Sequence, residues 1–164
     1  MNEGKIVDAN FIEVPIQRNT RNENKQIKAR EVPESFKENS NRLAQKDTNA
    51  LWVKKNNVSY FGYKNHVKQD SGSKLIIKYT LTDASADDSQ QTEPLLEEKD
   101  KGEPFYADSA YTGPSQEQAL VSKEMVYQVC EKGAKNRPLT EEQKENNRIK
   151  SKVRSRVEHI FGFM

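Results

Sequence analysis

The sequence has one cysteine, Cys130, so no disulfide can form within the chain. Such cysteine usage is typical of proteins from reducing compartments. Cys130 ends the mostly apolar run 126–130, and we expect it to be a core residue and not a nucleophile. No apolar run approaches the roughly 18 residues of a membrane-spanning helix, and residues 1–10 lack the apolar core of a secretion signal. These absences predict a cytoplasmic protein without a membrane partner.

Apolar residues are also scarce, because hydrophobic side chains make up 33% of the 164 residues and charged side chains 32%. The length suits one domain, and we predict a single domain over residues 1–164. The low apolar share predicts that part of the chain stays outside the core. Residues 17–50 are rich in Asn, Lys, Glu and Gln, so we expect a long, partly ordered insertion there.

The net charge of +2 does not by itself indicate a nucleic-acid binder. The charges are nevertheless distributed unevenly along the chain. Eight acidic residues and two lysines lie between Asp83 and Glu103, whereas six basic residues and one glutamate lie between Lys144 and Arg156. The basic segment predicts a face for a polyanion. Two solvated helix faces explain the same pattern equally well.

The rest of the chain alternates between strand-like and helix-like segments. Runs of β-branched and aromatic residues predict strands at 5–12, 58–68, 74–82, 104–108 and 126–130. The turn sequence 69–73 joins the second and third strands into a hairpin. Helices are predicted at 83–100 with Asp83 as the cap and Pro94 as a limit, at 115–124, and from about 140 to the end. This order predicts an α/β protein with a mixed β-sheet flanked by helices.

The last predicted helix has the clearest periodicity in the chain. Apolar residues recur at helical intervals and form one stripe, at Ile149, Val153, Val157, Ile160, Phe161 and Met164. Thr140 and Gln143 have the spacing of a capping box at its start. Arg154 and Glu158 are four residues apart at the border of the stripe, so we expect them to be neighbours on the helix surface.

Three carboxylates stand out by position. Asp8 lies inside the first predicted strand, Asp108 ends the fourth, and Glu158 borders the stripe of the last helix. If the sheet places these strands side by side, the two aspartates meet at its edge and the helix can add Glu158. Clustered carboxylates repel one another unless cations intervene, and oxygen ligands suit Mg²⁺ or Mn²⁺. The alternative to a metal site is that each carboxylate has an ordinary structural role. Asp8 would then end a strand, Asp108 would begin a turn, and Glu158 would pair with Arg154. The acidic pair at 87–88 is a rival pair of metal ligands, but acidic residues at a helix N-terminus are the better explanation for it.

Five segments carry motifs that belong together. They are Ile6–Ala9 with Pro15–Thr20, Tyr60–His66, Thr82–Ser85, Tyr106–Tyr111 and Arg154–Gly162. In this order they resemble the DDE transposases of bacterial insertion sequences, specifically the insertion-sequence-five group. Each segment alone is a weak signal, whereas all five together cover nearly the whole chain.

The resemblance implies a ribonuclease H-like fold and a catalytic, metal-binding triad of Asp8, Asp108 and Glu158. It implies cleavage of DNA at transposon ends with Mg²⁺ or Mn²⁺, and joining of the 3′-hydroxyl to target DNA. It also implies a homo-oligomer on DNA in the cytoplasm of a prokaryote, at the nucleoid. An inactive truncated remnant and a ribonuclease H-like nuclease outside transposition are the two rival interpretations.

The resemblance further implies DNA contacts. Arg154 would bind phosphate or orient Glu158, with a plain surface ion pair as the alternative. The other predicted DNA-binding residues are Lys64, His66, Lys150, Lys152, Arg156 and His159. Surface exposure is the alternative for Lys64 and His66, and a structural role is the alternative for His159. Trp52 is either an anchor for the insertion or a platform for a flipped base.

The chain departs from the family pattern at both ends. Only seven residues precede Asp8, where the family carries a helical DNA-binding region, and the chain ends six residues after Glu158, where the family helix continues. We therefore expect a catalytic domain truncated at both ends and without the N-terminal DNA-binding region.

Overall fold

The computed structural model describes residues 4–14 and 18–162. Met164 of the predicted stripe and residues 15–17 of the first motif lie outside the described residues. The chain divides into two compact units. The first contains residues 1–9, 66–80 and 87–164, and the second contains residues 10–65 and 81–86. Among the described helices, none is long and apolar enough to cross a membrane.

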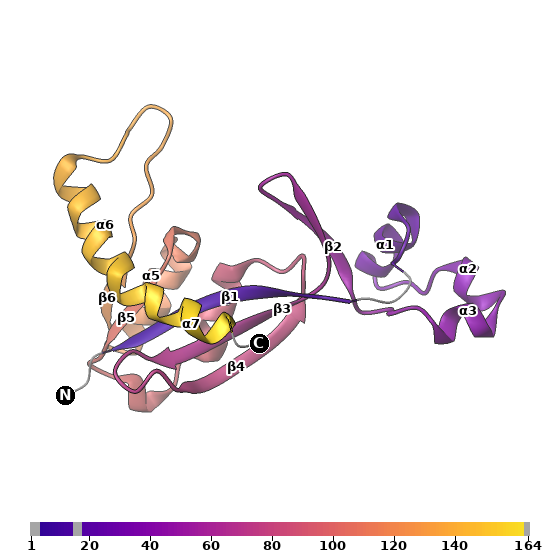
Figure 1. Ribbon diagram of the computed structural model, residues 1–164, viewed down its shortest axis with the longest axis horizontal. Helices are drawn as coiled ribbons and strands as arrows, with labels where there is room; N and C mark the ends of the chain where they lie inside the picture. Colours follow the sequence, from indigo (N-terminus) through magenta and orange to yellow (C-terminus); the bar gives the residue numbers. More distant parts are fainter. Residues whose placement is uncertain (1–3, 15–17, 163–164) are drawn as a thin grey trace. The chain divides into compact units, whose positions relative to one another are not determined.

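The strands form one sheet in the order β2-β3-β1-β5-β6, with β4 paired to β3 (Figure 1). The strands are β1 Lys5–Glu13, β2 Leu51–Lys55, β3 Val58–Asp70, β4 Ile76–Asp83, β5 Pro104–Ala107 and β6 Val126–Val129. β5 is parallel to both β1 and β6, whereas β2 and β3 are antiparallel. The predicted mixed sheet is therefore confirmed, and each predicted strand appears within about two residues of its expected bounds.

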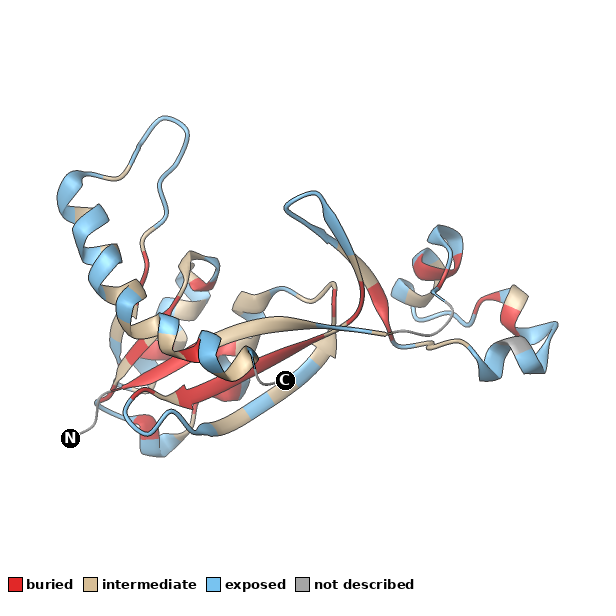
Figure 2. Cartoon of the chain, in the orientation of Figure 1, coloured by how far each residue is buried: buried red, intermediate tan, exposed pale blue. Residues whose placement is uncertain are grey.

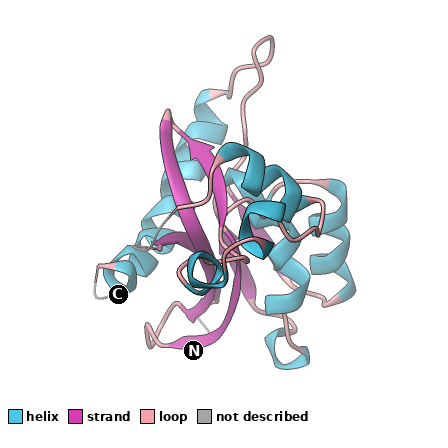
Figure 3. Ribbon diagram, turned by 90° about the vertical axis from the view of Figure 1, so that its right-hand side faces the viewer, coloured by secondary structure: helices cyan, strands magenta, loops and turns pink. Residues whose placement is uncertain are grey.

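Short helical segments connect and cover the strands (Figure 3). The α-helices are α1 Arg21–Lys28, α2 Glu34–Lys37, α3 Ser40–Ala44, α4 Thr92–Leu95, α5 Pro114–Ser122, α6 Glu141–Arg154 and α7 Glu158–Phe161. The 3₁₀ turns are η1 Asp88–Gln91, η2 Glu98–Asp100, η3 Ser109–Tyr111 and η4 Ser155–Val157. The capping box predicted at Thr140 and Gln143 is present at the start of α6.

The first unit has a hydrophobic core on each face of its sheet. Successive strand residues point to opposite faces, so Ile6 and Val7 enter different clusters. Val7 packs with apolar residues of the α4 and α5 region, including Leu95 and Leu120. Ile6 packs with Val157, at the end of the α6–η4 segment. Helical segments therefore cover both faces of the sheet at the part of β1 that carries Asp8.

The last helix differs from its prediction because it is not continuous. α6 ends at Arg154, a 3₁₀ turn follows, and α7 begins at Glu158. Val157 is fully buried, as the apolar stripe requires, but Ile149 is 59% exposed. The stripe thus contacts the sheet only near its C-terminal end.

The helix predicted over 83–100 is also different. β4 continues to Asp83, whose carboxylate accepts a hydrogen bond from Ser85 N at 2.8 Å in the turn that follows. Asp87 is the actual cap, because its side chain accepts from Ser89 N at the start of η1. The prediction of one helix capped by Asp83 is therefore wrong, because strand pairing extends β4 to Asp83 and short helical segments, η1, α4 and η2, follow it.

The second unit contains α1–α3, so residues 18–50 are more regular than predicted. The Glu23 carboxylate is buried and organises this segment. It accepts hydrogen bonds from Thr20 N at 2.7 Å, Ser35 Oγ at 3.0 Å and Lys46 Nζ at 3.3 Å. Polar groups that bond to one another here add to the few apolar anchors, such as the fully buried Phe36, because buried polar groups are tolerated when they are hydrogen-bonded.

β2 was not predicted as a strand, although a local signal for it exists. Lys55 pairs with Val58, so two residues, Asn56 and Asn57, connect β2 to β3. Their φ angles are 50° and 64°. Asparagine tolerates this left-handed conformation, and two such residues make the tight turn that suits a β-hairpin.

The interior of β3 contains a buried ion-pair network in the first unit. Figure 2 shows the buried stretch of this strand. Lys68 is fully buried, and its Nζ lies 2.6 Å from Asp100 Oδ2 and 2.6 Å from Glu97 Oε2. Asp100 is also fully buried, and its carboxylate accepts a hydrogen bond from Glu97 N. The network therefore ties β3 to η2.

We predict that Lys68→Met lowers the free energy of unfolding by about 3–5 kcal/mol, because it leaves the Asp100 carboxylate buried without its cation. Lys99→Met is the matched control, since the Lys99 side chain is 61% exposed and lies 3.3 Å from Glu97. Its expected effect is below about 0.5 kcal/mol. Urea denaturation followed by circular dichroism measures both, and equal small losses would contradict the structural role of Lys68.

Candidate active site

The pairing of β1 with β5 brings Asp8 and Asp108 together in the first unit. Lys5 pairs with Phe105 and Ile6 pairs with Tyr106 in parallel register. The same register, continued by two residues, places Asp8 opposite Asp108. The sequence predicted this meeting on the condition that the two strands lie side by side, and the register of their parallel pairing decides it.

Asp8 is held in a largely buried position. Its side chain is 15% exposed, and its Oδ1 accepts a hydrogen bond from Ala9 N at 2.9 Å. Its Oδ2 accepts from Arg154 Nη1 at 2.6 Å. Burial raises the pKa of the Asp8 carboxyl above its ordinary value, against the opposing effects of the Ala9 amide and Arg154, while the nearby Asp108 charge adds to the rise. Burial and the Asp108 charge thus disfavour the charged form of Asp8, and the Arg154 guanidinium is the cation that opposes them.

Asp108 follows β5 directly and caps the next turn. Its Oδ1 accepts a hydrogen bond from Ala110 N at 2.8 Å, which makes it the N-cap of η3. The side chain thus has one oxygen engaged with the backbone at the carboxyl end of the strand. This local bond orients the carboxylate beside Asp8.

Arg154 connects Asp8 to Glu158. Besides its bond to Asp8, Arg154 places Nη2 3.9 Å from Glu158 Oε1. The Glu158 side chain is 66% exposed, whereas the neighbouring Val157 is fully buried. Val157 therefore anchors this part of the chain, and Glu158 reaches the two aspartates through Arg154 rather than directly.

The described residues contain no group of three acidic, histidine or cysteine side chains arranged to hold a metal ion. The structure brings together Asp8, Asp108 and the Arg154 guanidinium, with Glu158 at the margin. The ion pair between Arg154 and Asp8 was not predicted. Its only sequence signal is the helical spacing that places Arg154 one turn before Glu158 at the border of the apolar stripe.

Tyr111 is a further residue of this region that sequence reasoning did not single out for chemistry. It is 1% exposed and packs in the same cluster as Val7. Within the described part of the chain, its hydroxyl makes no hydrogen bond. Burial raises the pKa of Tyr111 well above its ordinary value, and the charges of Asp88, Asp8 and Asp108 act in the same direction. Tyr111 thus places a buried, unbonded hydroxyl within the electrostatic influence of both carboxylates.

Two predicted DNA-binding residues lie inside the protein. His66 is fully buried in the first unit, with Nδ1 3.9 Å from Asp88 Oδ1. Lys64 is buried in the second unit, where its Nζ donates to the Ala86 carbonyl at 2.6 Å and lies over the Phe11 ring. Both side chains are engaged with protein groups, so we do not assign them to a DNA surface.

The predicted basic residues of the C-terminal segment fall into two groups. Lys150 Nζ donates to the Val129 carbonyl at 3.0 Å, and Arg156 Nη1 donates to the Ser71 carbonyl at 2.8 Å. Lys152 and His159, in contrast, are exposed. The first two thus hold α6 and η4 against the sheet, while Lys152 and His159 are accessible to a ligand.

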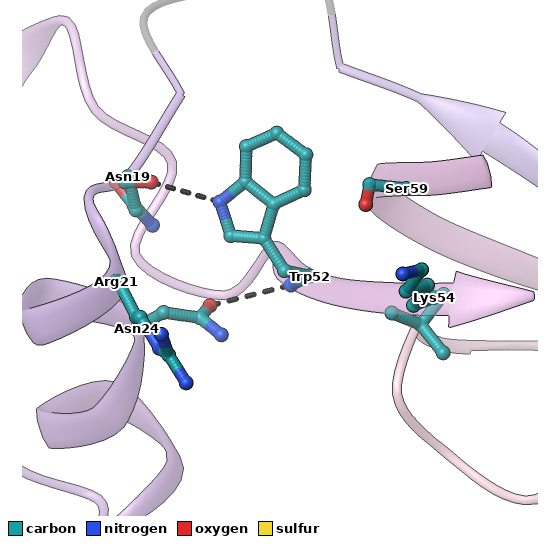
Figure 4. A pocket seen from close by; sticks show the side chains of 7 residues that line it. Asn19, Arg21, Asn24, Trp52, Lys54 and Ser59 are labelled. Atoms are coloured by element: carbon teal, nitrogen blue, oxygen red, sulfur yellow. Dashed lines mark hydrogen bonds between the residues drawn. The ribbon is translucent and has the colours of Figure 1, made fainter. Parts of the chain in front are cut away.

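Trp52 lies beside a cavity of about 590 Å³ in the second unit (Figure 4). Its indole Nε1 donates to the Asn19 carbonyl at 2.8 Å, and its backbone N donates to Asn24 Oδ1 at 3.3 Å. The indole also packs against the Phe61 ring. These contacts support the anchoring role for Trp52, because they join β2 to α1 and the residues before it.

Arg154→Ala is expected to lower the free energy of unfolding by about 1–3 kcal/mol, because Asp8 then lies beside Asp108 without a counter-charge. Arg148→Ala is the control, since Arg148 pairs with Glu145 at 3.6 Å on an exposed face of the same helix. Its expected effect is within about 0.5 kcal/mol. Thermal denaturation compares the two variants, and an equal effect would show that the bond to Asp8 contributes nothing.

Comparison with known proteins agrees with this arrangement. Residues 2–164 match the family described as the transposase DDE domain. A transposase for insertion sequence element IS1106 from Neisseria meningitidis serogroup B is 35% identical over 157 residues. That match covers 96% of this chain but only 52% of the relative, so the chain spans about half of the relative's length. No solved structure is significantly similar. With its mixed sheet flanked by helices, in the ribonuclease H-like manner, this chain belongs to the transposase DDE domain family.

Proposed function

We propose that this chain is the catalytic domain of a metal-dependent DNA transposase. In this proposal it cleaves phosphodiesters at transposon ends and joins the freed 3′-hydroxyl to target DNA. The observation that carries the proposal is the parallel pairing of β1 with β5, which brings the Asp108 charge close to Asp8, with Arg154 between Asp8 and Glu158. Membership of the transposase DDE domain family supports the reaction class.

The donor set is suited to a divalent cation. Carboxylate oxygens are the ligands that Mg²⁺ and Mn²⁺ prefer, and two carboxylates close together repel each other unless a cation lies between them. We assign Asp8 and Asp108 as the pair that would hold the ion, with the exposed Glu158 as the third ligand. Ions bound there would activate the attacking water or hydroxyl and stabilise the leaving oxygen of the phosphodiester.

Arg154 has a proposed role in handling the phosphate. A guanidinium binds phosphate and carboxylate with the same planar fork of donors. Arg154 Nη1 now holds Asp8, and Nη2 faces Glu158. We therefore assign to Arg154 the orientation of Glu158 and a contact to the phosphate next to the cleaved bond. Lys152 and His159, both exposed, would add contacts to neighbouring phosphates.

A non-catalytic remnant is the second candidate, and one observation favours it. Among the described residues no three-carboxylate group is assembled, and the Arg154 guanidinium occupies the place beside Asp8. Such a chain would fold partly and bind DNA weakly or not at all.

We also propose that the active complex contains two DNA ends and more than one copy of the chain, as the family resemblance implies.

A metal titration tests the assembled site. The melting temperature of the wild-type chain is expected to rise with Mn²⁺ or Mg²⁺, by about 5–10 °C at 100 times the dissociation constant, since this ligand excess contributes about 2.7 kcal/mol. Asp108→Asn should abolish the shift. Asp87→Asn is the control, because Asp87 is an exposed cap that asparagine replaces well, and it should keep the shift. No shift in the wild-type chain would support the remnant.

Nicking of a supercoiled plasmid then tests the reaction. Asp8→Asn and Asp108→Asn are expected to reduce metal-dependent nicking at least about 100-fold, on the order of 2.7 kcal/mol of transition-state stabilisation. Joined products between a transposon-end duplex and the plasmid distinguish a transposase from a nuclease that only cuts. Equal nicking by wild type and both variants would mean that the aspartates are not catalytic.

A further inference from the structure

A basic loop connects β6 to α6 in the first unit, and we define it as residues 130–140. It carries three cationic side chains, Lys132, Lys135 and Arg137, and all three are exposed. In the described ranges none of them forms an ion pair with an acidic side chain. Unpaired exposed cations on one short loop are a concentrated positive charge that is available to an anion.

The base of the basic loop is anchored to α6. The Asn147 side chain binds both backbone groups of Glu131, accepting from its N at 2.8 Å and donating to its carbonyl at 2.9 Å. Gln143 donates to the Glu131 carboxylate, which is the acidic group of this loop. Lys150 adds a bond to the Val129 carbonyl just before the loop. The loop therefore leaves the sheet in a defined direction.

The tip of the basic loop is a tight turn. Ala134 N donates to the Arg137 carbonyl at 3.0 Å, and Arg137 N donates to the Ala134 carbonyl at 3.0 Å. This reciprocal pair holds Lys135 at the turn, between the other two cations. A preformed turn loses less conformational freedom on binding than a flexible tail does, which favours association.

The fold places the basic loop beside the candidate active site. β5 and β6 are parallel, and Ala107 pairs with Val129 at their carboxyl ends. Asp108 and Cys130 are the next residues, so the loop and the carboxylate leave the sheet at the same edge. Figure 1 shows the loop extending from β6 before the chain returns along α6.

We propose that the basic loop binds the phosphate backbone of DNA next to the bond that is cut, an inference that rests on the proposed function. Lysine and arginine contacts to phosphate position a duplex without reading its sequence. From Cys130 to Lys135 the chain reaches at most about 17 Å. Neighbouring strands add roughly 4.8 Å and the lysine side chain extends further, so at roughly 3.4 Å per base pair the contacted phosphates lie within about one helical turn of the cleavage point.

The chain provides a matched set of control cations. Lys99, Lys101 and Lys123 each pair with an acidic side chain, Glu97, Glu124 and Glu98 respectively. They precede β5 and β6, at the opposite edge of the parallel strands from Asp108. Replacing these three lysines removes the same charge as replacing the three loop cations, but at a place where no DNA contact is proposed.

The experiment compares two triple variants with the wild-type chain. The loop variant is Lys132→Ala, Lys135→Ala and Arg137→Ala, and the control is Lys99→Ala, Lys101→Ala and Lys123→Ala. Fluorescence anisotropy with a labelled 30-base-pair duplex at several salt concentrations measures the slope of log affinity against log salt. The loop variant is expected to lose about 2–3 from the magnitude of this slope, because each phosphate contact contributes about 0.9. The control should lose less than about one.

The outcomes separate the two proposals. A wild-type slope in the loop variant, with tight DNA binding retained, would overturn the basic loop alone and leave the proposed function standing. An equal loss in both variants would show a general charge effect and also overturn it. No DNA binding by the wild-type chain would overturn both proposals. Circular dichroism of each variant confirms that it is folded, and the control variant reports any effect of charge removal on folding.

Discussion

Parallel pairing between β1 and β5 is the constraint on which the candidate site depends. A shift of one residue would move every side chain of β1 to the other face of the sheet. The observed register sends Val7, Phe105 and Ala107 into the core, so apolar burial holds the two strands in alignment. Asp8 and Asp108 then lie side by side as a consequence. The carboxylates are close because the core residues that precede them must be buried.

The proximity of these carboxylates has an electrostatic consequence for the helices. Two neighbouring carboxyl groups, one of them largely buried, need a positive charge. In this structure Arg154 supplies it from the end of α6, and the buried Val157 holds the following turn against the opposite core. The break between α6 and α7 is located between Arg154 and Glu158. The helix thus delivers a cation to the sheet and leaves Glu158 more exposed than the two aspartates.

Each of the two units is stabilised by a different kind of internal interaction. The core of the first unit combines two apolar clusters with the buried Lys68 network. The second unit relies more on polar groups that satisfy one another, such as the Glu23 carboxylate and the Trp52 contacts to Asn19. A segment with a polar sequence can therefore be regular, because buried hydrogen bonds supplement its few apolar contacts, such as those of Phe36. The basic residues also have two roles, because Lys150 and Arg156 donate hydrogen bonds to backbone carbonyls whereas Lys152 faces solvent.

The sequence by itself determined every described strand except β2, the hairpin of β3 and β4, the capping box at Thr140, and the positions of Asp8 inside β1 and Asp108 directly after β5. These features depend on residue patterns within a few neighbours, and the motif order identified the family. Tertiary structure alone decided that Asp87 and not Asp83 begins the helical segment, because strand pairing extends β4 to Asp83. It also decided that Lys64 and His66 are buried and that Arg154 binds Asp8 from 146 positions away. Such outcomes depend on which distant groups share a core or a charge, and no local pattern contains that information.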